Sequence, residues 1–326
     1  MSKRTLIVDS TQIQAFLECP QYWAYNYRQH LAPRQVELKD VMMQGSYGHK
    51  LLEIYYKNRA SGLQMKESLD GAISFDIDSE TNCKCGHAEQ WHKDLDIGGR
   101  SLPICSQCTG TPNYSHPFDP QPFPLSQPLR LQVIDKVRMY VMTNSINDFQ
   151  AHSPSTVEVG FSEPIYEDCE HLFILEGKID LLGLLGTQEV IVDHKFQSRA
   201  HTLYKKAVQF RNYSMVSGRL YMLINYIRFA RTTEKPFERA LVSFSQEEHK
   251  WWRGELVKIY KSMLHHLDNS SASGLYGPDS HNWGHCKGDW GRPCEYSTLC
   301  EERGNERVKL VLIENNFTKK EEWRPW

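Results

Sequence analysis

The stretch FILEGKIDLLGLLGTQEVIVDHKFQS, residues 173–198, contains two apolar runs separated by a short turn. The runs Phe173–Leu185 and Glu189–Phe196 have the residue content of β-strands. The segment between them, Gly186-Thr187-Gln188, is short enough to close a hairpin. The stretch therefore predicts two antiparallel strands joined by a tight turn.

Charged side chains interrupt these apolar strands. Folding the chain about Thr187 places Asp180 opposite His194 and next to Asp193. Asp193 and Lys195 are two residues apart, so they share one face of their strand. Burying such charges among Ile, Leu and Val is costly, and a divalent metal between the carboxylates offsets that cost. The hairpin is compatible with a metal site, with Lys195 near a bound water or phosphate. Taken alone it favours an ordinary surface hairpin with a salt bridge, and the rest of the chain favours the metal site.

Length and composition restrict the class of protein. The chain has 326 residues, 40% hydrophobic and 24% charged, which is ordinary for one large or two smaller globular domains. No apolar run is long enough to cross a membrane. The N-terminal sequence MSKRTLIVDSTQIQ lacks the apolar core and cleavage site of a secretory signal. We therefore expect a cytoplasmic protein without a membrane partner.

Basic residues gather in one part of the chain, although the net charge is only −2. Residues 195–261 hold 14 lysines and arginines against 5 aspartates and glutamates. A basic region beside a metal-type site favours a polyanionic substrate such as nucleic acid. A solvated helix face is the alternative explanation.

The N-terminal part is predicted to be helical and to carry one candidate ligand. Residues 10–27 have helical periodicity with Ser10 as N-cap, and Cys19-Pro20 interrupts them. The sequence GSYGH then leads into an amphipathic helix, with His49 near its start and Glu53 four residues later. The glycines allow close backbone approach, so a ligand role for His49 is as plausible as a structural one.

The rest of the chain alternates between helix and strand patterns. We predict helices at 130–149, 203–229 and 246–267 and strands at 156–164 and 239–245. Within the long helix predicted at 203–229, Gln209 and Tyr213 are four residues apart and share one face. They either cap a packed helix or contact a nucleic-acid backbone beside the metal.

Residues 62–130 differ in composition from their surroundings. They are rich in Pro, Gly, Ser and Asp and include a proline-studded linker at 117–128. We interpret them as an insertion whose small fold is stabilised by zinc, because two of its cysteines have a metal-knuckle spacing. The predicted zinc ligands are Cys83, Cys85, Cys105 and Cys108, with His87 or His92 as substitutes.

Three cysteines near the C-terminus, Cys286, Cys294 and Cys300, follow a Cys-x7-Cys-x5-Cys pattern. A closed site needs a fourth thiolate, and Cys19 is the candidate outside the other groups, besides Cys169. Four thiolates in a chain expected in the cytoplasm suit zinc or an iron–sulfur cluster. We predict a [4Fe-4S] cluster that joins the N-terminal helix to the C-terminal segment, with zinc as the alternative.

These patterns divide the chain into four parts. Residues 1–61 form an N-terminal helical part, and 62–130 form the zinc-binding insertion. Residues 131–270 form the main α/β core, and 271–326 form the cysteine clasp and tail.

The candidate residues resemble a known family. Their order is that of the RecB-like branch of the PD-(D/E)XK nucleases: His49, Asp180, Asp193-His194-Lys195 and Gln209-x3-Tyr213. The segment FLECPQYW, with Cys19, and the late cysteines resemble the iron–sulfur members of that branch, such as AddB-type recombination nucleases and CRISPR-adaptation exonucleases. The resemblance runs from Ser10 to Cys300, outside the insertion. Two features depart from the family pattern: the seven-residue gap after Cys286, and the insertion itself.

The resemblance implies an α/β fold with a restriction-endonuclease-like core, which is a central mixed sheet flanked by helices. It also implies hydrolysis of phosphodiester bonds with Mg²⁺ or Mn²⁺. It assigns His49, Asp180 and Asp193 to the metal, together with the backbone carbonyl of His194.

The resemblance also implies roles in catalysis. Lys195 is expected to position or deprotonate the attacking water and to stabilise charge on the phosphate. Gln209 and Tyr213 are expected to steady their helix beside the site and to contact DNA.

The implied function is a DNA exonuclease of recombination, repair or phage DNA metabolism in a bacterial or phage-infected cell, acting on single strands or DNA ends. The chain has no helicase phosphate loop, so unwinding would require a helicase or recombination partner. The alternatives are a DNA-binding adaptor with a degenerate nuclease fold, and a CRISPR-associated or structure-specific nuclease that acts within a complex.

Overall fold

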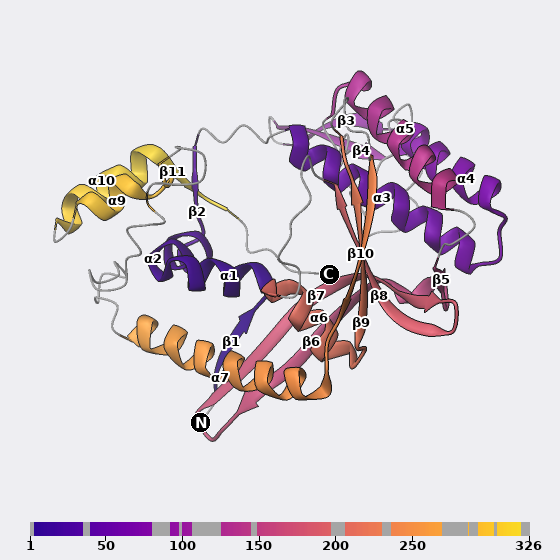
Figure 1. The fold of residues 1–326 in the computed structure, drawn as a ribbon. Coiled ribbons are helices and arrows are strands. Elements are labelled where there is room, and N and C mark those ends of the chain that lie inside the picture. The colour runs from indigo at the N-terminus through magenta and orange to yellow at the C-terminus, as the bar shows by residue number, and fades with distance from the viewer. Residues whose placement is uncertain are drawn as a thin grey trace.

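The structure is an α/β fold with a central mixed sheet flanked by helices, as predicted (Figure 1). It is a computed structural model that describes residues 3–34, 40–79, 92–97, 100–105, 125–144, 149–196, 206–229, 236–268, 286, 293–302 and 305–320.

The main sheet has seven strands within the described ranges, and their order is β1-β7-β8-β9-β10, with β5 and β6 also paired to β7. The strands are β1 (Arg4–Val8), β5 (Gln150–Ala151), β6 (Val157–Glu167), β7 (His171–Leu185), β8 (Gln188–Phe196), β9 (Tyr221–Ile227) and β10 (Phe237–Ser243). The pairs β1–β7 and β8–β9 are parallel, and the other pairs are antiparallel.

Helices cover both faces of this sheet (Figure 1). One layer consists of α3 (Asp40–Ala60), α4 (Met65–Ser79) and α5 (Gln127–Asn144). The opposite layer consists of α1 (Ser10–Glu18), α6 (Val208–Ser217) and α7 (Gln246–Asp268). Strand β8 shows why both faces are apolar: Val190 and Val192 pack toward the α3 layer, whereas Ile191 packs toward α6.

The predicted hairpin is present as β7 and β8, but its register differs by one residue from the prediction. The ladder pairs Leu185 with Gln188, so the turn has two residues instead of three. The first of them is a glycine with φ +62°, a conformation that suits glycine. The last pair of this ladder is Leu181 with Val192. Extending the same register by one residue sets Asp180 across from Asp193. The predicted alignment of Asp180 with His194 is therefore wrong.

The long helix predicted at 203–229 is also wrong. The structure has the short helix α6, then Gly218 with φ +69° as a left-handed cap, then strand β9. All residues from Met222 to Ile227 are buried. A strand buried on both faces has a continuous apolar run, which periodicity alone does not separate from a buried helix.

The N-terminal helix is interrupted where the sequence predicted. Helix α1 ends before Cys19, and Pro20 begins the short helix α2 (Pro20–Trp23), which continues as a π-helical turn (Ala24–Arg28). The N-cap of α1 is Asp9, whose side chain accepts a hydrogen bond from the Gln12 amide at 2.7 Å. The predicted cap, Ser10, is the first helical residue instead.

Part of the segment predicted as an insertion packs into the main protein. Helix α4 contributes Ala72 to the core formed by α3, α5 and β8, and Leu69 packs against the same core. The hairpin of β3 (His92–Ile97) and β4 (Arg100–Cys105) is a separate two-stranded sheet.

The C-terminal segment returns to the N-terminal one. Helices α9 (Ser297–Glu301) and α10 (Glu306–Asn316) precede β11 (Phe317–Lys319), which pairs with β2 (Leu31–Pro33). The hydroxyl of Tyr296 donates to the Leu31 carbonyl at 2.7 Å. Tyr296, Leu31, Phe317 and Cys300 form a small core of their own, so the chain ends hold each other in place.

Candidate active site

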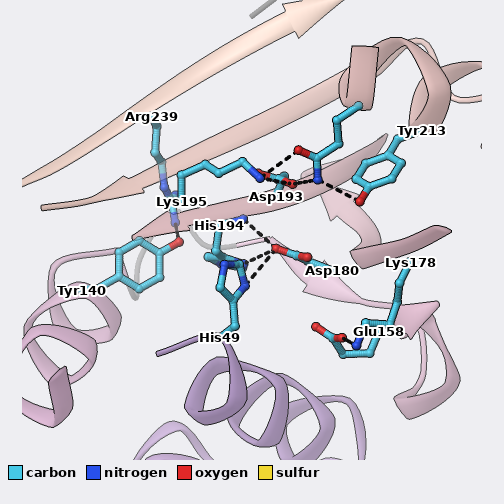
Figure 2. Close-up of polar contacts among 11 residues, drawn as sticks. His49, Tyr140, Glu158, Lys178, Asp180, Asp193, His194, Lys195, Tyr213 and Arg239 are labelled. Carbon is cyan, nitrogen blue, oxygen red and sulfur yellow. Dashed lines mark hydrogen bonds and ion pairs between the residues drawn. The ribbon is translucent and has the colours of Figure 1, made fainter. Parts of the chain in front are cut away.

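The site forms where β8 separates from β7. Their ladder ends at the pair of Leu181 and Val192, and from Ile191 onward β8 pairs with β9. Asp180 and Asp193 lie just past the last β7–β8 pair. The side chains at this fork come from β7, β8, α3 and α6 (Figure 2).

Asp180 is held between a helix and the neighbouring strand. Its Oδ2 accepts a hydrogen bond from the backbone N–H of His194 at 2.9 Å and lies 3.3 Å from Nδ1 of His49. Burial works against a charge on this carboxyl. Nevertheless, the charge and hydrogen bond of His49, together with the charge of Lys195, hold the pKa of Asp180 well below its usual range.

His49 reaches Asp180 because α3 approaches β8 closely. A Cβ atom at Gly48 would lie 2.4 Å from the ring of Phe196 on β8, so only glycine fits there. The predicted helix start near His49 is wrong, since α3 begins at Asp40 and His49 lies in its middle. The predicted close approach is confirmed. Burial opposes protonation of His49, but the charge of Asp180 raises the pKa of His49 above its ordinary value.

On the opposite side of β8, four side chains form one hydrogen-bonded group. Asp193 Oδ1 accepts from Lys195 Nζ at 3.1 Å and from Gln209 Nε2 at 3.4 Å. Lys195 Nζ also donates to Gln209 Oε1 at 3.1 Å. Gln209 Nε2 in turn donates to the hydroxyl of Tyr213 at 2.8 Å. Gln209 therefore links the strand residues to α6, which is the proximity predicted for Gln209 and Tyr213.

Asp193 is the most enclosed member of this group, with 0% exposure. Burial raises the pKa of Asp193 to about 6, against the opposing charge of Lys195. Its Oδ2 lies 3.0 Å from Lys195 Nζ but has no hydrogen bond of acceptable geometry to any described residue. Buried carboxylate oxygens normally have such partners, so this oxygen has capacity for a further electropositive one.

His194 contributes its backbone to the site, whereas its ring belongs to the core. The imidazole is 2% exposed and lies among the rings of Tyr56, Tyr140 and Phe149, at centroid distances of 5.6, 5.8 and 5.9 Å. Burial lowers the pKa of His194 to about 3, so the ring is neutral at physiological pH.

Two charged residues near the fork were not among the sequence-predicted site residues. Glu158 on β6 pairs with Lys178 on β7, and its side chain is only 14% exposed (Figure 2). Burial raises the pKa of Glu158, and the charge of Asp180 adds to that rise. Glu158 also has φ +58°, which is uncommon for a residue with a side chain. The sequence signal that could have identified Glu158 is its position between two valines of a predicted strand.

The four cysteines predicted to form a clasp approach one another. Cys19 and Cys300 are buried, and Cys286 and Cys294 are half-buried. Burial raises the pKa of the Cys294 thiol to about 11, and the nearby Cys286 and Cys19 contribute to that rise. Burial likewise raises the pKa of Cys300 to about 12, with contributions from the other three thiols. The backbone also connects two of them, since the Cys294 amide donates to the Cys286 carbonyl at 3.1 Å.

The predicted zinc ligands fall mostly outside the described residues. Cys83, Cys85 and Cys108 lie there, as does the substitute His87. The β3–β4 register pairs the backbone of Cys105 with that of His92.

The donor atoms at the fork suit a divalent cation chemically. Two carboxylates and an imidazole approach from three elements, and Oδ2 of the buried Asp193 accepts no hydrogen bond from the residues that the structure describes. In the structure each carboxylate pairs with a basic side chain: Asp193 with Lys195, and Asp180 with His49. Over the described ranges, no three His, Cys, Asp or Glu side chains stand together in metal-binding geometry.

Comparisons with known proteins give little information on this chain. No family model and no curated protein matches it. Among solved structures, one described as the crystal structure of SSO0001 matches with a TM-score of 0.31 and 13% sequence identity. The match covers 54% of this chain and 71% of that one. None of the described helices combines the length and apolarity needed to cross a membrane.

Proposed function

We propose that the protein is a metal-dependent nuclease of the PD-(D/E)XK type, which hydrolyses phosphodiester bonds in DNA. The observation that supports this most is the buried Asp193 carboxylate. Its Oδ2 lies 3.0 Å from Lys195 Nζ, at the point where β7, which carries Asp180, separates from β8, which carries Asp193. Two carboxylates and a lysine at such a fork form a site for a cation and a negatively charged substrate.

In this proposal Asp180, Asp193 and His49 would hold Mg²⁺ or Mn²⁺, with the His194 carbonyl as a further donor. When bound, the cation would supply Lewis-acid polarisation of the phosphate and would lower the pKa of a bound water. Lys195 orients the attacking water and stabilises charge that develops on the phosphate oxygens. In hydrolysis, the water loses a proton as its oxygen bonds to phosphorus, the bond from phosphorus to the leaving sugar oxygen breaks, and that oxygen takes up a proton.

Gln209 positions Lys195 in the same scheme. Its amide oxygen accepts from Lys195 Nζ, and its amide nitrogen donates to Asp193 and Tyr213. This bonding restricts the ammonium to one location beside the carboxylate. Tyr213 anchors the amide, since burial and the nearby Asp193 keep the pKa of Tyr213 well above its ordinary value and the phenol stays protonated.

We further propose that the clasp formed by Cys19, Cys286, Cys294 and Cys300 holds a [4Fe-4S] cluster with a structural role. Thiols with raised pKa values repel each other as thiolates, and a bound cluster or metal ion removes that repulsion. Zinc in the same clasp is the alternative, and metal analysis of the purified protein separates the two. The insertion is proposed to hold a separate zinc ion.

The decisive experiment uses end-labelled single-stranded and double-stranded DNA with the purified protein, with and without Mg²⁺ or Mn²⁺. We expect cleavage with either cation, none in its absence, and none by Asp193→Asn. The matched control is Asp70→Asn, which makes the same change at an exposed position on α4. A wild-type protein that binds DNA without cleaving it under any of these conditions would support the DNA-binding adaptor instead.

A further inference from the structure

Helix α5 has one face in the core and an outer face that exposes large apolar side chains to solvent. Val133, Val137 and Tyr140 are buried in the core shared with α3 and β8. On the outer face, Leu131 and Met142 have 53% and 67% of their surface exposed. Large apolar side chains gathered on one exposed surface are a common mark of a protein–protein contact.

Leu131 and Met142 are the two ends of a stripe that runs along α5. Residues spaced i, i+4, i+7 and i+11 lie on one side of a helix, and in α5 they are Leu131, Asp135, Arg138 and Met142. We call these four residues the α5 stripe. Nη1 of Arg138 lies 3.6 Å from Oδ1 of Asp135, and the two side chains are 49% and 69% exposed. A pair this exposed contributes little stability within one chain, and both charges are accessible to a partner.

The α5 stripe is complementary to itself. Consider a second copy of the helix that lies antiparallel, about a two-fold axis midway between residues 136 and 137. Leu131 then meets Met142 of the second copy, Asp135 meets Arg138 of the second copy, and the symmetry repeats both contacts. Apolar side chains meet at both ends, and opposite charges meet twice in the middle. A contact with an unrelated protein would not require this internal symmetry, so the pattern favours a second copy as the occupant.

A groove beside the α5 stripe adds to this surface. Its volume is about 470 Å³, and Leu131 and Asp135 of the stripe form part of its wall. Met139, which is 48% exposed, and Phe229, which follows β9, line it as well. The groove gives apolar side chains of a second copy a recess next to the stripe.

We propose that the α5 stripe is the contact surface of a two-fold symmetric dimer, in which the α5 helices of two copies pack antiparallel. This inference is independent of the nuclease function. The charges select the orientation, because parallel packing in register would set Asp135 against Asp135 and Arg138 against Arg138. At 1.5 Å per residue the stripe is about 17 Å long. The contact therefore belongs to the small class of interfaces, and the dimer should be weak and concentration-dependent.

The test is sedimentation equilibrium of the full chain over a wide range of protein concentration. The average mass of the wild type should rise with concentration from that of one chain toward that of two. Asp135→Arg sets like charges against each other at both central contacts, so it should weaken dimerisation about ten-fold or more, and Arg138→Asp should do the same. The double variant Asp135→Arg/Arg138→Asp exchanges the two charges and should restore association to the wild-type level.

The matched control is Asp70→Arg, the same charge change at an exposed position of α4 in the same helical layer (Figure 1). It should leave association unchanged. Circular dichroism checks that every variant is folded, which the exposure of the substituted side chains leads us to expect. A wild type that stays monomeric at every concentration overturns the proposal. A dimer that both single variants leave intact also overturns it, because that dimer must use another surface. A double variant that remains as weakly associated as the single ones overturns the antiparallel register.

Discussion

The approach of α3 to β8 is open to a direct test through two glycines of one helix. In Gly48→Ala, the added Cβ atom would lie 2.4 Å from Cε1 of Phe196. In Gly45→Ala, the nearest atom is Cβ of Phe196 at 3.7 Å, an ordinary van der Waals distance. The two variants make the same chemical change one turn apart, so they separate helix propensity from steric conflict.

The expected magnitudes follow from the two environments. Replacing a helical glycine by alanine stabilises a helix by about 0.5–1 kcal/mol, and Gly45→Ala should show that gain. At Gly48 the same gain is opposed by overpacking of roughly 1–3 kcal/mol. The ring of Phe196 has little room to yield, because it is 8% exposed, stacks on Phe229 at 5.7 Å and meets His49 edge-on at 5.3 Å.

The assay is urea unfolding followed by circular dichroism, with nuclease activity measured in parallel. Gly48→Ala should be less stable than Gly45→Ala by about 1–3 kcal/mol. It should also be less active, because the displaced helix carries His49 away from Asp180. Adding Phe196→Leu to Gly48→Ala should recover part of the loss, a coupling that a double-mutant cycle measures. Equal or greater stability of Gly48→Ala relative to Gly45→Ala would refute this reasoning.

The remaining predictions concern single residues. Lys195→Ala should abolish cleavage while DNA binding in Ca²⁺ persists; retained turnover would contradict its role. Because His194 is neutral when folded and its pKa is depressed from 6.5 to about 3, its contribution to stability should be lost as pH falls below about 6.5. Urea midpoints measured against pH should show a shallower acid loss in His194→Phe. Anaerobically purified protein should absorb broadly near ~400 nm; Cys19→Ala should bleach that band and lower the melting temperature, whereas Cys169→Ala should change neither.

Local sequence patterns were enough to predict the hairpin and the residues suited to chemistry. The strands β7 and β8 follow from apolar runs that flank a glycine-containing turn, and turn geometry is a property of a few adjacent residues. The shared face of Asp193 and Lys195 follows from the two-residue period of a strand, and the structure places these side chains 3.0 Å apart. The four-residue spacing of Gln209 and Tyr213 predicted that they share one helix face, and in the structure a hydrogen bond joins them.

Long-range packing accounts for two of the errors, and the length of one turn accounts for a third. The segment 221–227 is a strand because β8 and β10 lie on either side of it. The composition of the segment itself does not reveal these neighbours. The register error at Asp180 arose because the turn takes two residues, not three. Glu158 was overlooked because its proximity to Asp180 depends on the pairing of β6 with β7.

The sequence by itself determined which segments form the central hairpin and which side chains are chemically able to act there, because alternation, turn residues and helical spacing are local properties. Only the tertiary structure decided that His49 meets Asp180, that Gln209 links Lys195 to α6, and that the thiol of Cys19 approaches those of the C-terminal segment. Each of these contacts joins residues far apart in the chain. Their distances depend on how helices pack on the sheet, which is a cooperative property of the whole core.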